Sequence, residues 1–198
     1  MLLPKVSFVI PTYNASKHLP KCLGSIAKQD YPKNQIEVII ADGGSHDDTR
    51  EIAKRFNTKI ISNPRRLAEY GVQLGVSEAS GDLVVIFAAD NELISNSWIQ
   101  MVANIFIENP DVSAVWGRLA SGKNDTSLNR YFELIQSDPL NWFMNKNLDK
   151  YRAKTQVKSR DYIVFNVDPT MPLVWGANGL VYRADRIKTV SYTHLTLP

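Results

Sequence analysis

Short apolar runs alternate with segments of helical spacing from Val6 to Trp116, and this alternation is the strongest constraint on the fold. Runs such as Val6–Ile10, which Pro11 stops, have the length and composition of buried parallel strands. Short connections between these strands and the helices predict an open, mostly parallel α/β sheet with helices on both faces. The predicted strands are Val6–Ile10, Ile36–Ala41, Lys59–Ile61, Leu83–Phe87, Val112–Trp116 and Leu180–Tyr182, and the predicted helices are Ala15–Gln29, Ser45–Phe56, Leu67–Glu78 and Ile94–Ile107.

Two of the predicted helices carry capping signals at their starts. Asn14 stands where the N-cap of the first helix belongs. Ser45-His46-Asp47-Asp48 fits the capping-box spacing at the start of the second. These signals predict that the two helices begin at Ala15 and directly after Ser45.

Composition places the chain among ordinary globular proteins. It has 198 residues, of which 44% are hydrophobic, and its 23 basic and 20 acidic residues give a net charge of +3. A chain of this length can bury a core without disulfides or metal. The charges are mixed and form no basic stripe, so nucleic acid is not expected as a partner. Cys22, the single cysteine, lies in an apolar helical pattern and is expected to be buried.

The sequence shows no targeting signal. Its first residues contain no basic segment followed by an apolar run. The longest apolar run, Leu83–Ala89, has seven residues and is too short to cross a bilayer. These features predict a soluble, cytoplasmic protein.

Polar and aromatic residues follow three of the predicted strands directly. In open α/β sheets, ligands bind beyond the carboxyl ends of the strands. Tyr13 can offer a flat face to a nucleobase, and Asp42 can accept a hydrogen bond from a base N–H. Asp90 can hold a hard cation that bridges a diphosphate. The three strand ends therefore predict a nucleotide site with a divalent cation.

Each of these residues also has a purely structural interpretation. Tyr13 could close the end of the sheet, and Asp42 could form a turn ahead of two glycines. Asp90 could cap a helix that begins near Ser95. The occurrence of all three at successive strand ends favours the site over the structural interpretations.

Phosphate-binding motifs give a competing hypothesis. No GxGxxG sequence follows the first strand, which argues against a dinucleotide-binding dehydrogenase. Gly117–Lys123 matches GxxxxGK, but Asn124 stands where the metal needs a Ser or Thr hydroxyl. An ordinary surface loop is the favoured interpretation, and a P-loop nucleotidase is the third hypothesis for function.

Three segments give the chain a resemblance to the family 2 glycosyltransferases, which have the A-type glycosyltransferase (GT-A) fold. They are Val6–Asn14 (VSFVIPTYN), Asp42–Thr49 (DGGSHDDT), and Ala79–Asp82 (ASGD) leading to Asp90-Asn91. The resemblance covers about residues 5–187. It implies transfer of a sugar, with inversion, from a nucleotide-diphosphate sugar, most often a UDP-sugar. It further implies Mg²⁺ or Mn²⁺ as cofactor, a saccharide or lipid-linked acceptor, a role in cell-envelope polysaccharide synthesis, and membrane association of the full-length protein at the inner face.

The resemblance also assigns residues to the site. It implies that Pro11, Thr12, Tyr13 and Asp42 surround the nucleoside and that Asp90 meets the metal and the diphosphate. Arg65 and Arg66 lie near the family's basic contact to the donor, although ordinary arginines at a helix start are an equal alternative. The acceptor-side residues that it implies are Gly176, Asn178 and Arg183, and a plain hairpin is the alternative for them.

The chain departs from the family pattern in two places. The metal motif is usually Asp-x-Asp, and Ala88 stands at its first position. The carboxylate that serves as general base follows the strand matching Leu180–Tyr182, and Asp185 comes too early to match it. The alternative to an active transferase is therefore a catalytically silent fragment that binds nucleotide sugar and lacks its general base.

We expect one glycosyltransferase-like domain over residues 1–187. Its nucleotide-donor half is expected at about residues 1–118 and its acceptor-side half at about 119–187. The segment 188–198 resembles translated adaptor sequence, and we expect it to be non-native.

Overall fold

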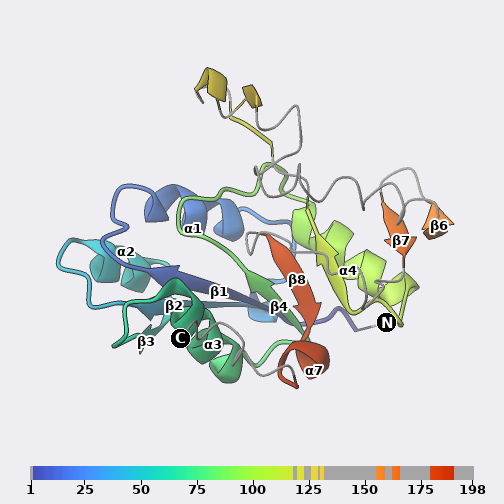
Figure 1. Cartoon of the computed structure of the whole chain (residues 1–198), viewed down its shortest axis with the longest axis horizontal. Coiled ribbons are helices and arrows are strands. Elements are labelled where there is room, and N and C mark those ends of the chain that lie inside the picture. The colour runs from blue at the N-terminus through green and yellow to red at the C-terminus, as the bar shows by residue number, and fades with distance from the viewer. Residues whose placement is uncertain are drawn as a thin grey trace, which may run out of the picture. The chain divides into compact units, whose positions relative to one another are not determined.

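The computed structural model of the chain describes residues 2–117, 120–122, 126–128, 130–131, 155–158, 162–165 and 179–189 (Figure 1). The chain divides into two compact units, of which the first takes in Met1–Trp116 and Ala177–Pro198 and the second Gly117–Gly176. In the second unit, strands β6 (Thr155–Lys158) and β7 (Ile163–Phe165) form an antiparallel pair. Of the segment expected to be non-native, residues 188 and 189 belong to the described structure and the rest lies outside it.

The described part of the first unit is built on one six-stranded sheet with the order β3-β2-β1-β4-β8-β5 (Figure 1). Strands β1 to β4 pair in parallel. Strand β8 is antiparallel to both of its neighbours, β4 and β5. The mostly parallel sheet predicted from the sequence is confirmed. Its strands are β1 (Val6–Thr12), β2 (Ile36–Asp42), β3 (Lys59–Ser62), β4 (Leu83–Ile86), β5 (Ala114–Trp116) and β8 (Leu180–Arg183).

Helices cover both faces of this sheet, as predicted. Phe8 and Ile10 of β1 point into one core, which α1, α2 and α4 share. Val9, between them in the sequence, points into a second core with α3 and α7. No helix in the described residues is long and apolar enough to span a membrane. The helices of the first unit are α1 (Leu19–Ala27), α2 (Thr49–Arg55), α3 (Ala68–Glu78), α4 (Trp98–Glu108), α7 (Ala184–Ile187) and the 3-10 turn η1 (Lys33–Gln35).

Three helices begin four residues later than the sequence predicts. Helix α1 begins four residues after Ala15, α2 four residues after Ser45, and α4 four residues after Ile94. The residues at the N-caps of these helices make no side-chain cap hydrogen bonds. The predicted capping roles of Asn14 and Ser45 are therefore wrong. The reason is tertiary, because both side chains bind a neighbouring loop instead. Strand β1 also continues one residue past Pro11.

Gly75 allows helix α3 to pack closely against the side chain of Val9 in the sheet. A Cβ atom at this position would lie 2.2 Å from Cγ1 of Val9 in β1. Only glycine permits so close an approach, and α3 therefore lies low on the face of β1. This places the start of α3 beside the carboxyl ends of β1 and β2.

The amino ends of three strands are held together by Glu37. Its carboxylate accepts hydrogen bonds from the Ser7 hydroxyl and from the amide and hydroxyl of Ser80, the latter two at 2.9 Å. The amide of Gly81 donates to the Ser7 hydroxyl at 2.9 Å. A Cβ atom on Gly81 would lie 2.7 Å from the carbonyl oxygen of Lys5. These contacts fix the start of β4 beside β1.

We expect Gly75→Ala to destabilise the protein by about 1–3 kcal/mol, because the added methyl group overpacks the contact with Val9. Urea unfolding followed by circular dichroism measures the change. Gly24→Ala in α1 is the matched control, since nothing lies within 4 Å of a Cβ atom there. The control should gain up to about 1 kcal/mol from helix propensity. Equal effects of the two substitutions would contradict the close approach at Gly75.

Candidate functional site

The strand ends that the sequence singled out lie side by side in the structure. In the parallel register, Thr12 of β1 pairs with Asp42 of β2, and Asp42 pairs with Ser62 of β3. The carboxyl ends of three neighbouring strands therefore meet at one edge of the sheet. The loops that follow them carry Tyr13, Gly43 and Arg66.

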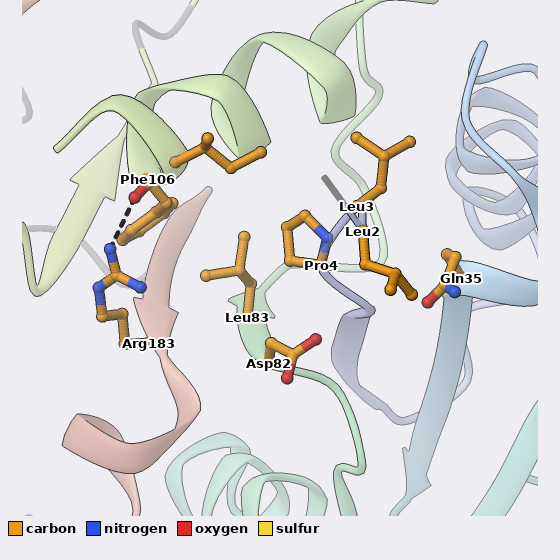
Figure 2. Close-up of a pocket in the computed structure, with 9 residues that line it drawn as sticks. Leu2, Leu3, Pro4, Gln35, Asp82, Leu83, Phe106 and Arg183 are labelled. Carbon is orange, nitrogen blue, oxygen red and sulfur yellow. Dashed lines mark hydrogen bonds between the residues drawn. The ribbon is translucent and has the colours of Figure 1, made fainter. Parts of the chain in front are cut away.

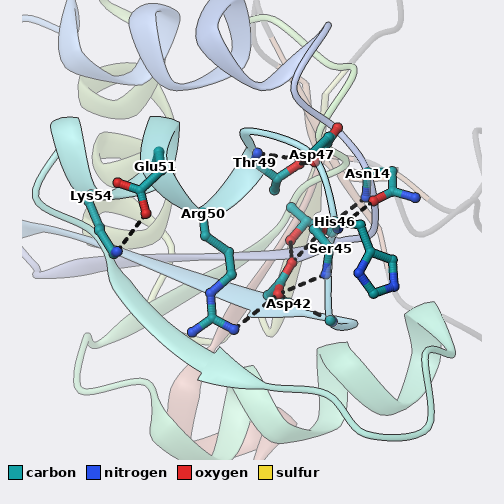
Figure 3. Close-up of polar contacts among 11 residues, drawn as sticks. Asn14, Asp42, Ser45, His46, Asp47, Thr49, Arg50, Glu51 and Lys54 are labelled. Atoms are coloured by element: carbon teal, nitrogen blue, oxygen red, sulfur yellow. Dashed lines mark hydrogen bonds and ion pairs between the residues drawn. The ribbon is translucent and has the colours of Figure 1, made fainter.

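Asp42 is enclosed at this edge, and its side chain has no exposed surface. Oδ2 accepts hydrogen bonds from the amides of Gly44 and Ser45, both at 3.2 Å (Figure 3). Oδ1 accepts from the Ser45 hydroxyl at 2.6 Å and from the Thr12 hydroxyl at 3.3 Å. The Arg50 guanidinium, on α2, lies 3.6 Å from Oδ2 and balances its charge. The carboxylate is thus turned toward its own loop.

The loop after β1 is joined to the loop after β2. The amide of Asn14 donates to the Ser45 hydroxyl at 2.9 Å, and the amide of His46 donates to Oδ1 of Asn14 at 2.9 Å (Figure 3). Asn14 reaches this position with a left-handed φ of 50°. The side chains predicted to cap helices instead connect the two loops.

Asp47 and Thr49 extend the same connection. The Ser16 amide donates to Oδ2 of Asp47 at 3.0 Å, and the Ala15 amide donates to the Thr49 hydroxyl at 2.7 Å. The Thr49 hydroxyl and amide both donate to Oδ1 of Asp47. These hydrogen bonds, that of the Thr49 hydroxyl foremost, lower the pKa of Asp47 well below its usual range.

Because its pKa is lowered in the folded state, Asp47 stabilises the fold above about pH 4, and the stabilisation is lost as the pH falls below that value. We expect Asp47→Asn to lower the urea midpoint at pH 7 and to reduce its dependence on pH below about pH 4. Asp48→Asn is the control, because Asp48 makes no side-chain cap hydrogen bond. An unchanged acid profile in Asp47→Asn would contradict this role.

Tyr13, Gly43 and Arg66 form a surface that we call the platform. The Arg66 guanidinium lies over the Tyr13 ring, 5.2 Å from its centroid, and Tyr13 is 45% exposed. A Cβ atom on Gly43 would lie 3.4 Å from Cδ2 of Tyr13 and 3.5 Å from Cα of Arg66, so Gly43 lies against both residues. The platform presents an aromatic face and a positive charge together.

The turn after β3 positions Arg66. The Asn63 amide donates to the carbonyl oxygen of Asp42 at 2.8 Å, and the Arg66 amide donates to that of Asn63 at 3.1 Å. The buried Asn63 side chain donates to the carbonyl oxygen of Leu67 at 2.9 Å. Arg66 has a left-handed φ of 57°.

Arg65, next to it in sequence, lies elsewhere. Its guanidinium is 4.4 Å from the centroid of Tyr70, on α3. The structure thus separates the two arginines that the sequence treats alike, and only Arg66 contacts Tyr13.

Asp90 is exposed on the turn that follows β4. The predicted alternative, that it caps a helix, is wrong, because Ser97 is the N-cap of α4.

Cys22 is buried, as expected, and its thiol donates to the carbonyl oxygen of Ala88 at 3.6 Å. Burial, then the nearby charges of Asp90 and Glu92, raise the pKa of Cys22 to about 12. The thiol is therefore inert.

The donor atoms at this edge fit a divalent cation only in part. Within the described residues, no group of three or more His, Cys, Asp or Glu side chains could hold a metal ion. Mg²⁺ is commonly bound by one or two carboxylates together with substrate phosphates. Asp90 fits that arrangement, in which the metal binds with a diphosphate rather than to the protein alone.

Arg183, for which the resemblance predicts an acceptor-side role, does not lie at this edge. It pairs with Leu83 at the amino end of β4, because β8 is antiparallel. Its guanidinium donates to the carbonyl oxygens of Val112 and Phe106, both at 2.7 Å, and so caps the end of α4 (Figure 2). The predicted acceptor residues Gly176 and Asn178 lie outside the described residues.

A pocket of about 420 Å³ lies at this amino edge, away from the platform (Figure 2). Apolar side chains from the chain start and from α4 line it together with Asp82 and Arg183. The Asp82 carboxylate accepts a hydrogen bond from the Lys5 amide at 2.8 Å. Both charged groups thus already make hydrogen bonds to the main chain.

The sequence did not reveal three residues that shape the site. Arg50 and Asn63 contact Asp42 from α2 and from the turn after β3, and no motif indicated these contacts. Ser45 belongs to the Asp42–Thr49 segment, but its sequence pattern predicted a helix cap and not the hydrogen bond to Asp42. The GxxxxGK segment follows β5, and three of its seven residues, 118, 119 and Lys123, lie outside the described residues.

The platform lies beyond the carboxyl ends of the strands, where open α/β sheets bind their ligands. The sequence matches the family model Glycosyl transferase family 2 over residues 7–171. The chain therefore belongs to glycosyl transferase family 2.

Two curated relatives show how far the sequence similarity extends. One is the dolichyl N-acetyl-alpha-D-glucosaminyl phosphate 3-beta-D-2,3-diacetamido-2,3-dideoxy-beta-D-glucuronosyltransferase of Methanococcus voltae. It is 33% identical over 146 residues, which cover 68% of this chain and 45% of that protein. The poly(ribitol-phosphate) beta-N-acetylglucosaminyltransferase TarS of Staphylococcus aureus (strain Mu50) is 27% identical over 125 residues, covering 60% and 22%. The chain thus spans less than half the length of these relatives.

Solved structures confirm the GT-A fold. S. aureus TarS 1–349 matches with a TM-score of 0.57 and 26% identity, covering 62% of this chain and 37% of that one. A mannosyltransferase from Pyrobaculum calidifontis, in complex with GDP-Man and Mn²⁺, matches with a TM-score of 0.52 and 27% identity, covering 59% and 36%.

Proposed function

We propose that this chain binds a nucleotide-diphosphate sugar, a UDP-sugar in the first instance, and belongs to an enzyme that transfers the sugar with inversion. The observation that carries the proposal is the platform, which the joined loops hold at the carboxyl ends of β1, β2 and β3. The TarS relative has been crystallised with UDP, and the Pyrobaculum mannosyltransferase with GDP-Man, which supports a nucleotide donor.

The platform offers two interactions to a nucleotide, which are stacking of the base and hydrogen bonding to the phosphates. A nucleobase stacks on the exposed ring of Tyr13, beside Pro11 and Thr12, which are the last two residues of β1. The exposed Arg66 side chain, whose guanidinium lies beside the Tyr13 ring, can form charge-assisted hydrogen bonds with phosphate oxygens. Arg65, held over Tyr70, takes no part in this proposal.

Asp90 would hold Mg²⁺ or Mn²⁺ together with the diphosphate of the donor. When bound, the metal supplies Lewis-acid neutralisation of the nucleoside diphosphate leaving group. The Mn²⁺ in the Pyrobaculum complex supports a divalent ion. Because Ala88 provides no second carboxylate two residues earlier, we expect metal affinity to depend on the nucleotide.

The acceptor is proposed to be a saccharide or a lipid-linked saccharide of the cell envelope. The names of the Methanococcus and Staphylococcus relatives include a dolichyl phosphate sugar and a poly(ribitol-phosphate). Binding without turnover is the second candidate, and the single carboxylate at the metal position favours it. Release of UDP from a UDP-sugar in the presence of an acceptor distinguishes the two.

We expect Arg66→Ala to weaken UDP binding by roughly tenfold, about 1.4 kcal/mol, because a charged donor to the phosphates is lost. Isothermal titration calorimetry with UDP and Mn²⁺ measures this effect. Arg65→Ala is the matched control and should leave the affinity unchanged, since its guanidinium lies over Tyr70. An equal loss in both variants would remove Arg66 from the site.

We expect Mn²⁺ to strengthen UDP binding in the unaltered chain, and Asp90→Asn to abolish that enhancement while metal-free binding persists. The same titrations, with Mn²⁺ and with a chelator, give both affinities. Asp111→Asn, at the amino end of β5, is the control and should retain the enhancement. Enhancement that survives Asp90→Asn would place the metal on other residues.

A further inference from the structure

Asp42 has no acceptor capacity left for a ligand. An ionised carboxylate offers about four lone-pair sites. The amides of Gly44 and Ser45 and the hydroxyls of Ser45 and Thr12 occupy four. The Asp42 side chain is fully enclosed, and the guanidinium of Arg50 lies 3.6 Å from its Oδ2 atom. A base N–H could bind Asp42 only by displacing one of these partners.

The contacts of Asp42 and of its partners connect the loops that follow β1, β2 and β3. The Ser45 hydroxyl donates to Asp42 and accepts from the Asn14 amide, so it reaches the loop that carries Tyr13. The carbonyl oxygen of Asp42 accepts from Asn63, which opens the turn that carries Arg66. Gly43, between Asp42 and Gly44, lies against both Tyr13 and Arg66.

We propose that Asp42 is a positioning residue that builds the platform through Gly44, Ser45 and Thr12, and that it does not accept a hydrogen bond from the nucleobase. The proposal rests on the proposed function in that the ligand is a nucleotide. The nucleobase is then held by its face on Tyr13, and its imide N–H has no partner at Asp42.

The physical consequence of Asp42→Asn follows from the direction of the hydrogen bonds. The amide oxygen still accepts from the hydroxyls, but the new NH₂ group faces the N–H groups of Gly44 and Ser45. Donors then face donors, and a buried polar group is left without a partner. The loop that supports the platform therefore becomes less ordered. This effect does not depend on which hydrogen-bonding atoms the nucleobase has.

The experiment is a two-by-two cycle of the unaltered chain and Asp42→Asn, titrated with UDP and with N3-methyl-UDP, which lacks the imide N–H. We expect Asp42→Asn to weaken both ligands by the same factor, about tenfold, with a coupling below twofold. A loss confined to UDP, with a coupling of tenfold or more, would show direct recognition of the base and overturn the proposal.

Ser45→Ala keeps the carboxylate and removes one of its donors. It should weaken UDP binding, and its effect should be less than additive with that of Asp42→Asn, because both act on one loop. Normal affinity in Ser45→Ala would contradict the positioning role.

Amide hydrogen exchange gives a readout that needs no ligand and no transfer reaction. In Asp42→Asn, the amides of Gly44 and Ser45 should exchange at least about tenfold faster than in the unaltered chain, while the amides of α1 stay protected. Unchanged exchange at both positions would overturn the proposal. Failure of the unaltered chain to bind UDP would instead reject the proposed function, and the exchange rates would still decide the role of Asp42.

Discussion

The enclosed carboxylate of Asp42 is the interaction on which the site depends. It lies at the end of β2, where the parallel register brings it beside Thr12 and Ser62. A buried charge is costly unless donors surround it, and here four hydrogen bonds and the Arg50 guanidinium do so. Among these donors, Thr12 directly precedes Tyr13, and the Ser45 hydroxyl also accepts from the Asn14 amide. Satisfying one buried charge therefore also holds the loop that carries Tyr13, while the main-chain carbonyl of Asp42 binds the turn that carries Arg66.

The two edges of the sheet have different tasks. At the amino edge, Glu37 binds Ser7 and Ser80, while Arg183 closes the end of α4, so polar groups there are consumed by the fold. At the carboxyl edge, Tyr13 and Asp90 are left exposed. Gly75 permits helix α3 to lie close to β1. The turn that precedes α3 carries Arg66, so the position of α3 also affects the platform.

Much of the fold was predictable because burial imposes a period on the sequence. The strands and the two covering layers follow from apolar runs and helical spacing, and Tyr13, Asp42 and Asp90 follow from their place after strands. The helix starts were predicted wrongly. Asn14 and Ser45 have the chemistry of N-caps, but each finds a partner in a loop about 30 residues away. Local capping signals could not weigh that long-range competition.

By itself, the sequence determined the family, the parallel core and the edge at which we propose that a ligand binds, because strand length, order and turn residues are local properties. Only the tertiary structure decided what each polar side chain does there. It separated Arg66 from Arg65, turned Asp42 inward, and inserted β8 antiparallel between β4 and β5. That last choice reversed the direction of β8 and carried Arg183 to the opposite edge. Strand direction depends on pairing partners distant in sequence, which no local pattern encodes.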